Sequence, residues 1–130
     1  MYKEQNEAGE QECLMRWAFF MRHKLPALDL LYHIPNGGSR HPKEAANLKR
    51  QGVKAGVPDL CLPVPCAPYH GLYIELKDGN NKATDHQKKW LAALRKQGYA
   101  AVICYGWVKA AEIIESYLTG GMKDENQENH

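Results

Sequence analysis

The sequence predicts a single α/β domain in which helices cover a central mixed β-sheet. Helical and strand-like segments alternate along the chain, and the strand-like segments are short and rich in apolar residues. A length of 130 residues suffices for one hydrophobic core and is short for two. The expected elements, in order, are helix 9–24, strand 29–34, helix 42–51, strand 59–64, strand 72–77, helix 85–97, strand 99–104 and helix 108–118.

Helical spacing and turn residues define the first half of this domain, which we place at residues 9–119. An apolar stripe runs along helix 9–24, and extending it backwards by one turn places Glu10 on the stripe. Strand 29–34 leads into a tight loop, PNGGSR, and helix 42–51 begins at a proline. The polar segments outside the domain, 1–8 and 120–130, are expected to be flexible tails.

Side-chain alternation and capping residues define the second half. In strand 72–77 the apolar side chains alternate with Tyr73, Glu75 and Lys77. Thr84 and Gln87 have the spacing of a capping box at the start of a helix. Strand 99–104 is apolar throughout, which is typical of a central strand.

The formal net charge of +2 hides an uneven distribution. Residues 1–12 carry −3 and residues 122–130 carry −2, so residues 13–121 carry +7, from 15 basic and 8 acidic side chains. A basic body suits a polyanion such as nucleic acid, although a well-solvated surface explains it equally well. No apolar run reaches the ~18–20 residues that span a bilayer, and the polar start lacks the apolar segment of a signal peptide. We therefore expect an intracellular protein without a membrane partner.

The cysteines and histidines do not have the spacing of a common metal site. The four cysteines are widely spread, no CxxC pair is present, and a fourth ligand to join Cys61, Cys66 and His70 is not obvious. A small zinc-binding interaction protein is therefore a weak alternative. The six histidines are scattered, and none is assigned to catalysis.

Two carboxylates and a lysine fall on consecutive predicted strands. Asp59 begins one strand, and Glu75 and Lys77 lie two residues apart on one face of the next strand. Pairing of these strands brings Asp59 beside Glu75, and two buried carboxylates so close together require a cation between them. Oxygen ligands favour Mg²⁺ or Mn²⁺, and a lysine beside such an ion stabilises charge on a phosphate. The pattern indicates metal-assisted hydrolysis of phosphodiesters.

The same residues also have a purely structural interpretation. Asp59 fits a loop cap, and Glu75 with Lys77 fits an exposed ion pair on an amphipathic strand. From average residue usage, roughly one chain in ten of this length holds both Pro-Asp and Glu-x-Lys by chance. The catalytic interpretation is favoured because the two halves of the motif fall on consecutive strands. In addition, a helix with an inward carboxylate, Glu10, precedes these strands, and a helix with an inward glutamine, Gln87, follows them.

Longer segments resemble a known nuclease family. GVPDL followed by IELK resembles the PD-(D/E)xK nuclease superfamily. Longer segments resemble the VRR-NUC family of this superfamily, in its small stand-alone form from phages and bacteria. These segments are EQECLMRWA, IPNGGSR, LKRQGVKAGVPDL, YIELK and HQKKWLAALRKQGYAAVICYG. The resemblance covers about residues 10–118. It implies a restriction-endonuclease-like core with a central mixed sheet flanked by helices.

The resemblance also implies roles for individual residues. The metal ligands would be the carboxylates of Glu10, Asp59 and Glu75 and the main-chain carbonyl of Leu76, with Glu10 acting directly or through water. The catalytic residues would be Asp59, Glu75, Lys77 and Gln87. Gln87 would orient a metal-bound water or the lysine, and this role competes with its predicted place in a capping box.

Two segments are candidates for contact with the DNA backbone. In PNGGSR the glycines allow close approach to a phosphate and Arg40 can pair with it, whereas a simple turn is the alternative. A basic stretch leads into the strand that begins at Asp59, although a basic helix face is usually just solvated. The candidates are Asn36, Gly37, Gly38, Arg40, Lys49, Arg50 and Lys54.

The sequence therefore predicts a Mg²⁺- or Mn²⁺-dependent endodeoxyribonuclease that needs no nucleotide cofactor. The resemblance implies a homodimer that cuts Holliday junctions in the cytoplasm of a bacterial or phage-infected cell. Flaps and other branched DNA are the close alternative substrates. A non-catalytic DNA-binding accessory protein on the same scaffold is a second hypothesis. Such a protein would have lost Asp59, Glu75 or Lys77, and none is lost.

Overall fold

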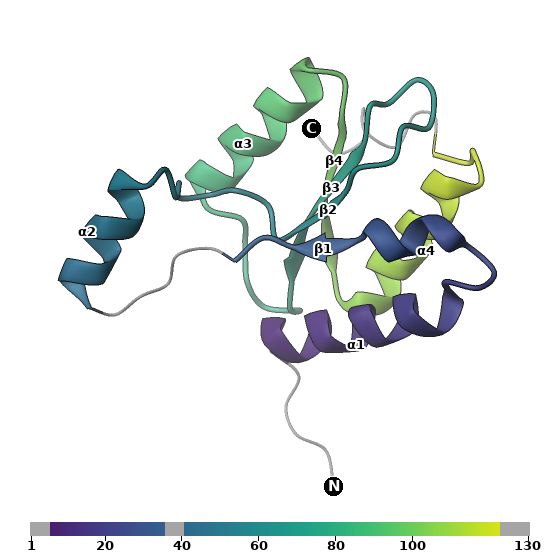
Figure 1. The fold of residues 1–130 in the computed structure, drawn as a ribbon, viewed down its shortest axis with the longest axis horizontal. Coiled ribbons are helices and arrows are strands. Elements are labelled where there is room, and N and C mark those ends of the chain that lie inside the picture. The colour runs from purple at the N-terminus through teal and green to yellow at the C-terminus, as the bar shows by residue number, and fades with distance from the viewer. Residues whose placement is uncertain (1–5, 36–40, 123–130) are drawn as a thin grey trace, which may run out of the picture.

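A mixed four-stranded sheet forms the centre of the protein. The computed structural model describes residues 6–35 and 41–122 (Figure 1). The strands lie in the order β1 (Tyr32–His33), β2 (Leu60–Leu62), β3 (Leu72–Lys77) and β4 (Ala100–Tyr105). β1, β2 and β3 pair antiparallel, and β3 and β4 pair parallel. The predicted α/β class with a mixed sheet is confirmed.

Helices cover both faces of this sheet. α1 (Glu7–Met21) and α4 (Trp107–Leu118) pack against each other and against one face, whereas α3 (Asp85–Lys96) lies on the opposite side, over β4. α2 (Pro42–Arg50) stands apart from the sheet and from the other helices (Figure 1). The result is a three-layered body with one projecting helix.

The two faces of the sheet have different chemistry. The face toward α1 and α4 is the hydrophobic core, which includes Leu14, Leu60, Leu72, Ile74, Leu76, Val102, Ile114 and Tyr117. Full burial of each such side chain stabilises the fold by roughly 1.5–3 kcal/mol. Because successive strand residues alternate in direction, Tyr73, Glu75 and Lys77 point to the other face, the α3 side. The core therefore holds the register that lines up these polar residues.

The strand predicted at residues 29–34 is wrong for most of its length. Pro26–Leu30 forms a 3₁₀ helix instead, and only Tyr32 and His33 enter the sheet. A proline stands in its first turn, and Leu28 and Leu31 are buried at a spacing of three residues. That spacing matches the period of a 3₁₀ helix, so both leucines reach the core from one side.

The prediction that strand 99–104 is central is also wrong. β4 pairs with β3 alone and lies at the edge of the sheet that the described residues form. It is apolar because α3 and α4 both contact it. The continuous apolar run thus reflects burial by helices rather than by flanking strands.

The helix boundaries agree with prediction within three residues. α1 begins at Glu7 instead of residue 9, because the side chain of Asn6 accepts a hydrogen bond from Gly9 N at 2.8 Å and caps the helix. The last turn of α1 ends at Met21. α1 therefore starts within the segment expected to be a tail, and Met122 at the other end of the domain is buried.

Candidate active site

Asp59 is fixed by hydrogen bonds from two neighbouring strands. Its Oδ2 accepts a hydrogen bond from Leu76 N at 2.8 Å, which ties its side chain to β3. Its main-chain carbonyl accepts from Ile34 N at 2.7 Å and from His33 Nδ1 at 2.8 Å, which ties its backbone to the β1 segment. The carboxylate is therefore held in place between the two strands.

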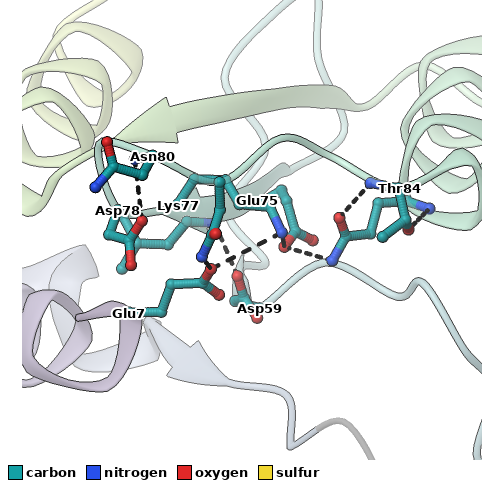
Figure 2. A network of polar contacts seen from close by, with 10 residues as sticks. Glu7, Asp59, Glu75, Lys77, Asp78, Asn80 and Thr84 are labelled. Atoms are coloured by element: carbon teal, nitrogen blue, oxygen red, sulfur yellow. Dashed lines mark hydrogen bonds and ion pairs between the residues drawn. The ribbon is translucent and has the colours of Figure 1, made fainter.

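Glu75 and Lys77 are buried beside Asp59 (Figure 2). Their exposed fractions are only 1% and 5%. Lys77 Nζ lies 3.7 Å from Glu75 Oε2. The interpretation of these residues as an exposed ion pair on an amphipathic strand is therefore wrong, because α3 and the start of α1 cover this end of β3.

Gln87 performs two functions at once, which corrects the expected competition between them. Its Oε1 accepts a hydrogen bond from Thr84 N at 2.8 Å, and the Thr84 hydroxyl accepts from Gln87 N at 3.2 Å. This is the predicted capping box of α3. Its Nε2 donates to Glu75 Oε2 at 3.0 Å. Opposite ends of one amide thus cap the helix and orient a carboxylate.

The carboxylate of α1 that reaches this cluster is Glu7, whereas Glu10 points elsewhere. Glu7 Oε2 lies 4.0 Å from Lys77 Nζ and accepts a hydrogen bond from Asn81 Nδ2 at 2.7 Å. Glu10 Oε1 accepts from Trp107 N at 2.8 Å, so Glu10 caps the first turn of α4. In this arrangement Glu10 stabilises the fold.

The sequence contains a signal for Glu7, which the predicted helix start at residue 9 excluded. Glu7, Glu10 and Leu14 follow one another at helical spacings of three and four residues. A stripe extended by two turns instead of one would have included Glu7. Starting the helix at residue 9 left this carboxylate among the charges of the tail.

The environment of Glu75 is unfavourable for a carboxylate without a further partner. Burial, and next the negative charge of Asp59, raise its pKa from the ordinary 4.5 to about 8, and Lys77 offsets this only in part. Its Oε1 is buried and accepts no hydrogen bond from any residue that the structure describes. Such an unpaired buried oxygen fits a bound cation, which would complete its coordination.

The residues of the site fit a divalent ion that prefers oxygen ligands. In residues 6–35 and 41–122, no three His, Cys, Asp or Glu side chains are close enough together to hold a metal ion. Asp59 and Glu75 would thus need main-chain oxygen, such as the carbonyl of Leu76, or water. Mg²⁺ commonly keeps several waters and uses one or two carboxylates. A cavity of about 200 Å³ beside Asp59 and Leu76 leaves room for them.

The positions of Cys61, Cys66 and His70 do not form a zinc site. Cys61 is buried on β2 opposite Tyr32 and Tyr73. The backbone of Cys66 pairs with Tyr69, and the His70 ring packs edge-on against Tyr99. Within residues 6–35 and 41–122, these three side chains do not form a group that could hold a metal ion.

Two of the predicted DNA contacts lie near the cluster. Lys49 and Lys54 line a cleft of about 890 Å³ that also reaches Gln87. Arg50 is exposed and hydrogen-bonds to the Asn47 side chain beside it. Four further candidates, Asn36, Gly37, Gly38 and Arg40, lie outside the described residues.

Comparison with known proteins decides the family. The family model of the VRR-NUC domain matches residues 5–107 of this chain. The chain belongs to the VRR-NUC family. A solved structure, "VRR_NUC domain protein", is 38% identical to this VRR-NUC chain, with a TM-score of 0.77 over 91% of this chain and 92% of that one. No match is found among curated proteins.

Family membership places the cluster in a nuclease-type domain. The resemblance seen in the sequence is confirmed, and the mixed sheet with its helices is a PD-(D/E)xK-like core. A VRR-NUC domain implies DNA as its substrate. Within the described residues, no helix is long and apolar enough to cross a membrane.

The raised pKa of Glu75 predicts a pH-dependent stability of the metal-free protein. The folded state binds the Glu75 proton more tightly than the unfolded state, so the contribution is full below pH ~4.5 and is lost as pH rises through about 8. We expect urea unfolding in EDTA to show a loss on the order of a few kcal/mol over this range. Glu75→Gln should remove this slope.

The matched control is Glu112→Gln, at an exposed position of α4. It should retain the slope of the wild-type protein. An identical pH dependence in the wild-type and Glu75→Gln proteins would contradict this description of the site.

Proposed function

We propose that this chain hydrolyses phosphodiester bonds of DNA with Mg²⁺ or Mn²⁺ held by Asp59, Glu75 and the main-chain carbonyl of Leu76. The observation that carries the proposal is the buried Glu75 carboxylate, whose Oε1 has no described hydrogen-bond donor although Asp59 and Lys77 lie beside it. A bound cation would supply Lewis-acid activation of the phosphate and of the attacking water.

The side chains around the ion would each have a separate role. Asp59 and Glu75 present preorganised oxygen ligands, because the Leu76 amide and the Gln87 amide each hold one carboxylate oxygen. Lys77 has the position to stabilise negative charge that develops on the phosphate in the transition state. Its ammonium group is kept near the reacting centre by Glu75 and Glu7.

Glu7 and Gln87 are positioning residues in this mechanism. Gln87 orients Glu75 while its other end is anchored in the capping box. Glu7 holds the lysine from the side of α1 and is itself held by Asn81. We assign to Glu7 the place on the first helix that the resemblance suggested for Glu10, since Glu10 caps α4.

For the substrate, we propose branched DNA, with the Holliday junction first and flaps second. A homodimer with two-fold symmetry would present two active sites to a symmetric four-way junction. The excess of basic residues over 13–121 supports contact with several phosphates. Arg40 and the neighbouring residues 36–38, together with Lys49, Arg50 and Lys54, are the proposed backbone contacts.

Removal of either end of the motif should abolish cleavage. We expect Lys77→Ala and Asp59→Asn to lose at least ~10³-fold in rate, because each removes a group that acts on the transition state. The assay offers a four-way junction, a flap, single-stranded DNA and linear duplex, first with Mg²⁺ and then with Mn²⁺. Lys109→Ala, an exposed change on α4, is the matched control.

Symmetric junction cutting by the wild-type and Lys109→Ala proteins alone would support the proposal. Equal cutting by Lys77→Ala would refute the mechanism. Tight junction binding without cutting under either metal would make the protein a DNA-binding accessory protein.

Glu7 and Glu10 should respond differently to the same substitution. Glu7→Gln removes a charge beside Lys77, so its cleavage rate should fall about tenfold while its stability changes little. Glu10→Gln removes a charged cap from α4, so it should lose roughly 1 kcal/mol of stability. Its cleavage rate should fall less than that of Glu7→Gln. Cleavage rates and urea unfolding of both variants give the comparison. The reverse pattern would return Glu10 to the metal environment.

A further inference from the structure

A large cleft lies between α2 and the N-terminal end of α3. Its volume is about 890 Å³, which falls within the range of roughly 300–1,000 Å³ typical of ligand sites. α2 contributes no buried residue, and Figure 1 shows it standing apart from the body. The α2 side of the cleft is thus not filled by the protein's own core.

The cleft combines an apolar wall with a cationic margin. Ala45, Leu48 and Val53 form an apolar wall and are half-buried. Lys49 and Lys54 are exposed at its margin. The described residues that line the cleft include no Asp or Glu. An apolar wall with a cationic margin is complementary to a base attached to a phosphate.

The cleft adjoins the proposed active site at Gln87. This residue lines the cleft and donates a hydrogen bond to Glu75 Oε2 at 3.0 Å. Thr84, whose hydroxyl caps α3, lies at the same end. A DNA strand whose scissile phosphate lies at Lys77 and the proposed cation site would therefore pass beside the cleft.

We propose that this cleft binds unpaired nucleotides of the DNA strand next to the bond that is cut. In a duplex the bases are paired and stacked, and a protein at the backbone meets mainly sugars and phosphates. An apolar wall gains binding energy from base faces only where those faces are free. The inference rests on the proposed nuclease function and deepens it, because it makes local unpairing a requirement for tight binding.

A second copy of the chain fits the cleft less well. A two-fold interface places the same patch on both subunits. If the cleft lay on the two-fold axis, the Lys49 and Lys54 margins of the two copies would meet, and the cleft lining in the described residues holds no carboxylate to pair with them. Charge complementarity therefore favours nucleic acid as the occupant.

Binding of two labelled DNA probes to the full-length protein tests the proposal. One probe is a blunt duplex, and the other is the same duplex with a single-stranded overhang. Fluorescence anisotropy in EDTA measures both affinities without cleavage. We expect Leu48→Ala to reduce the preference for the overhang about fivefold, because it removes apolar contact with the unpaired bases.

A charge placed in the cleft provides a second variant with a matched control. Ala45→Glu adds a carboxylate to the apolar wall, whereas Ala46→Glu makes the same change at the exposed neighbouring position, outside the cleft lining. Both variants replace one good helix former by another, so α2 should fold. We expect Ala45→Glu to weaken overhang binding about tenfold. Ala46→Glu should weaken it less than about threefold, because its charge lies outside the wall.

Several outcomes would overturn the proposal. Equal effects of Leu48→Ala on both probes would show contact with the duplex backbone, and no effect on either would show that the cleft is not used. Conversion of a dimer to a monomer by Leu48→Ala, measured by analytical ultracentrifugation, would assign the cleft to a second copy. Failure of the nuclease proposal is scored separately, by whether the wild-type protein cuts DNA with Mg²⁺ or Mn²⁺.

Discussion

The structure depends on the placement of a carboxylate, Glu75, where its charge is poorly stabilised. Water is excluded from it, Asp59 repels it, and one of its oxygens accepts no hydrogen bond from a described residue. Burial of such a group costs several kcal/mol unless it is compensated. Lys77 and Gln87 compensate in part, and a divalent cation would complete the compensation. Folding therefore preorganises carboxylate oxygens at the place where an ion would bind.

The remaining architecture holds this arrangement together. The pairing of β2 with β3 sets Asp59 beside Glu75, and the hydrogen bond from Leu76 N to Asp59 locks the two strands at that point. On the far face of the sheet, α1 and α4 bury the core leucines and fix the strand register. α1 also brings Glu7 to Lys77. One helix thus serves both the core and the candidate site.

Much of this could be predicted because period-two alternation and helix caps are local properties. Strand alternation placed Glu75 and Lys77 together, and the capping box placed Gln87 at the start of α3. The second hydrogen bond of Gln87 could not be predicted, because it depends on the packing of α3 over the sheet. Glu7 is a different case, because the helical stripe and the Asn6 cap are local signals that place the start of α1 before residue 9. Long-range packing, which leaves no local pattern, decided the case of Gln87.

Calorimetric titration of Mn²⁺ into the metal-free protein tests whether Asp59 and Glu75 bind a cation. We expect a saturable site in the wild-type chain that is lost in Asp59→Asn, while Glu112→Gln, an exposed change on α4, retains it. Equal Mn²⁺ binding by the wild-type and Asp59→Asn proteins, or no binding by either, would contradict a cation site formed by the carboxylates of Asp59 and Glu75.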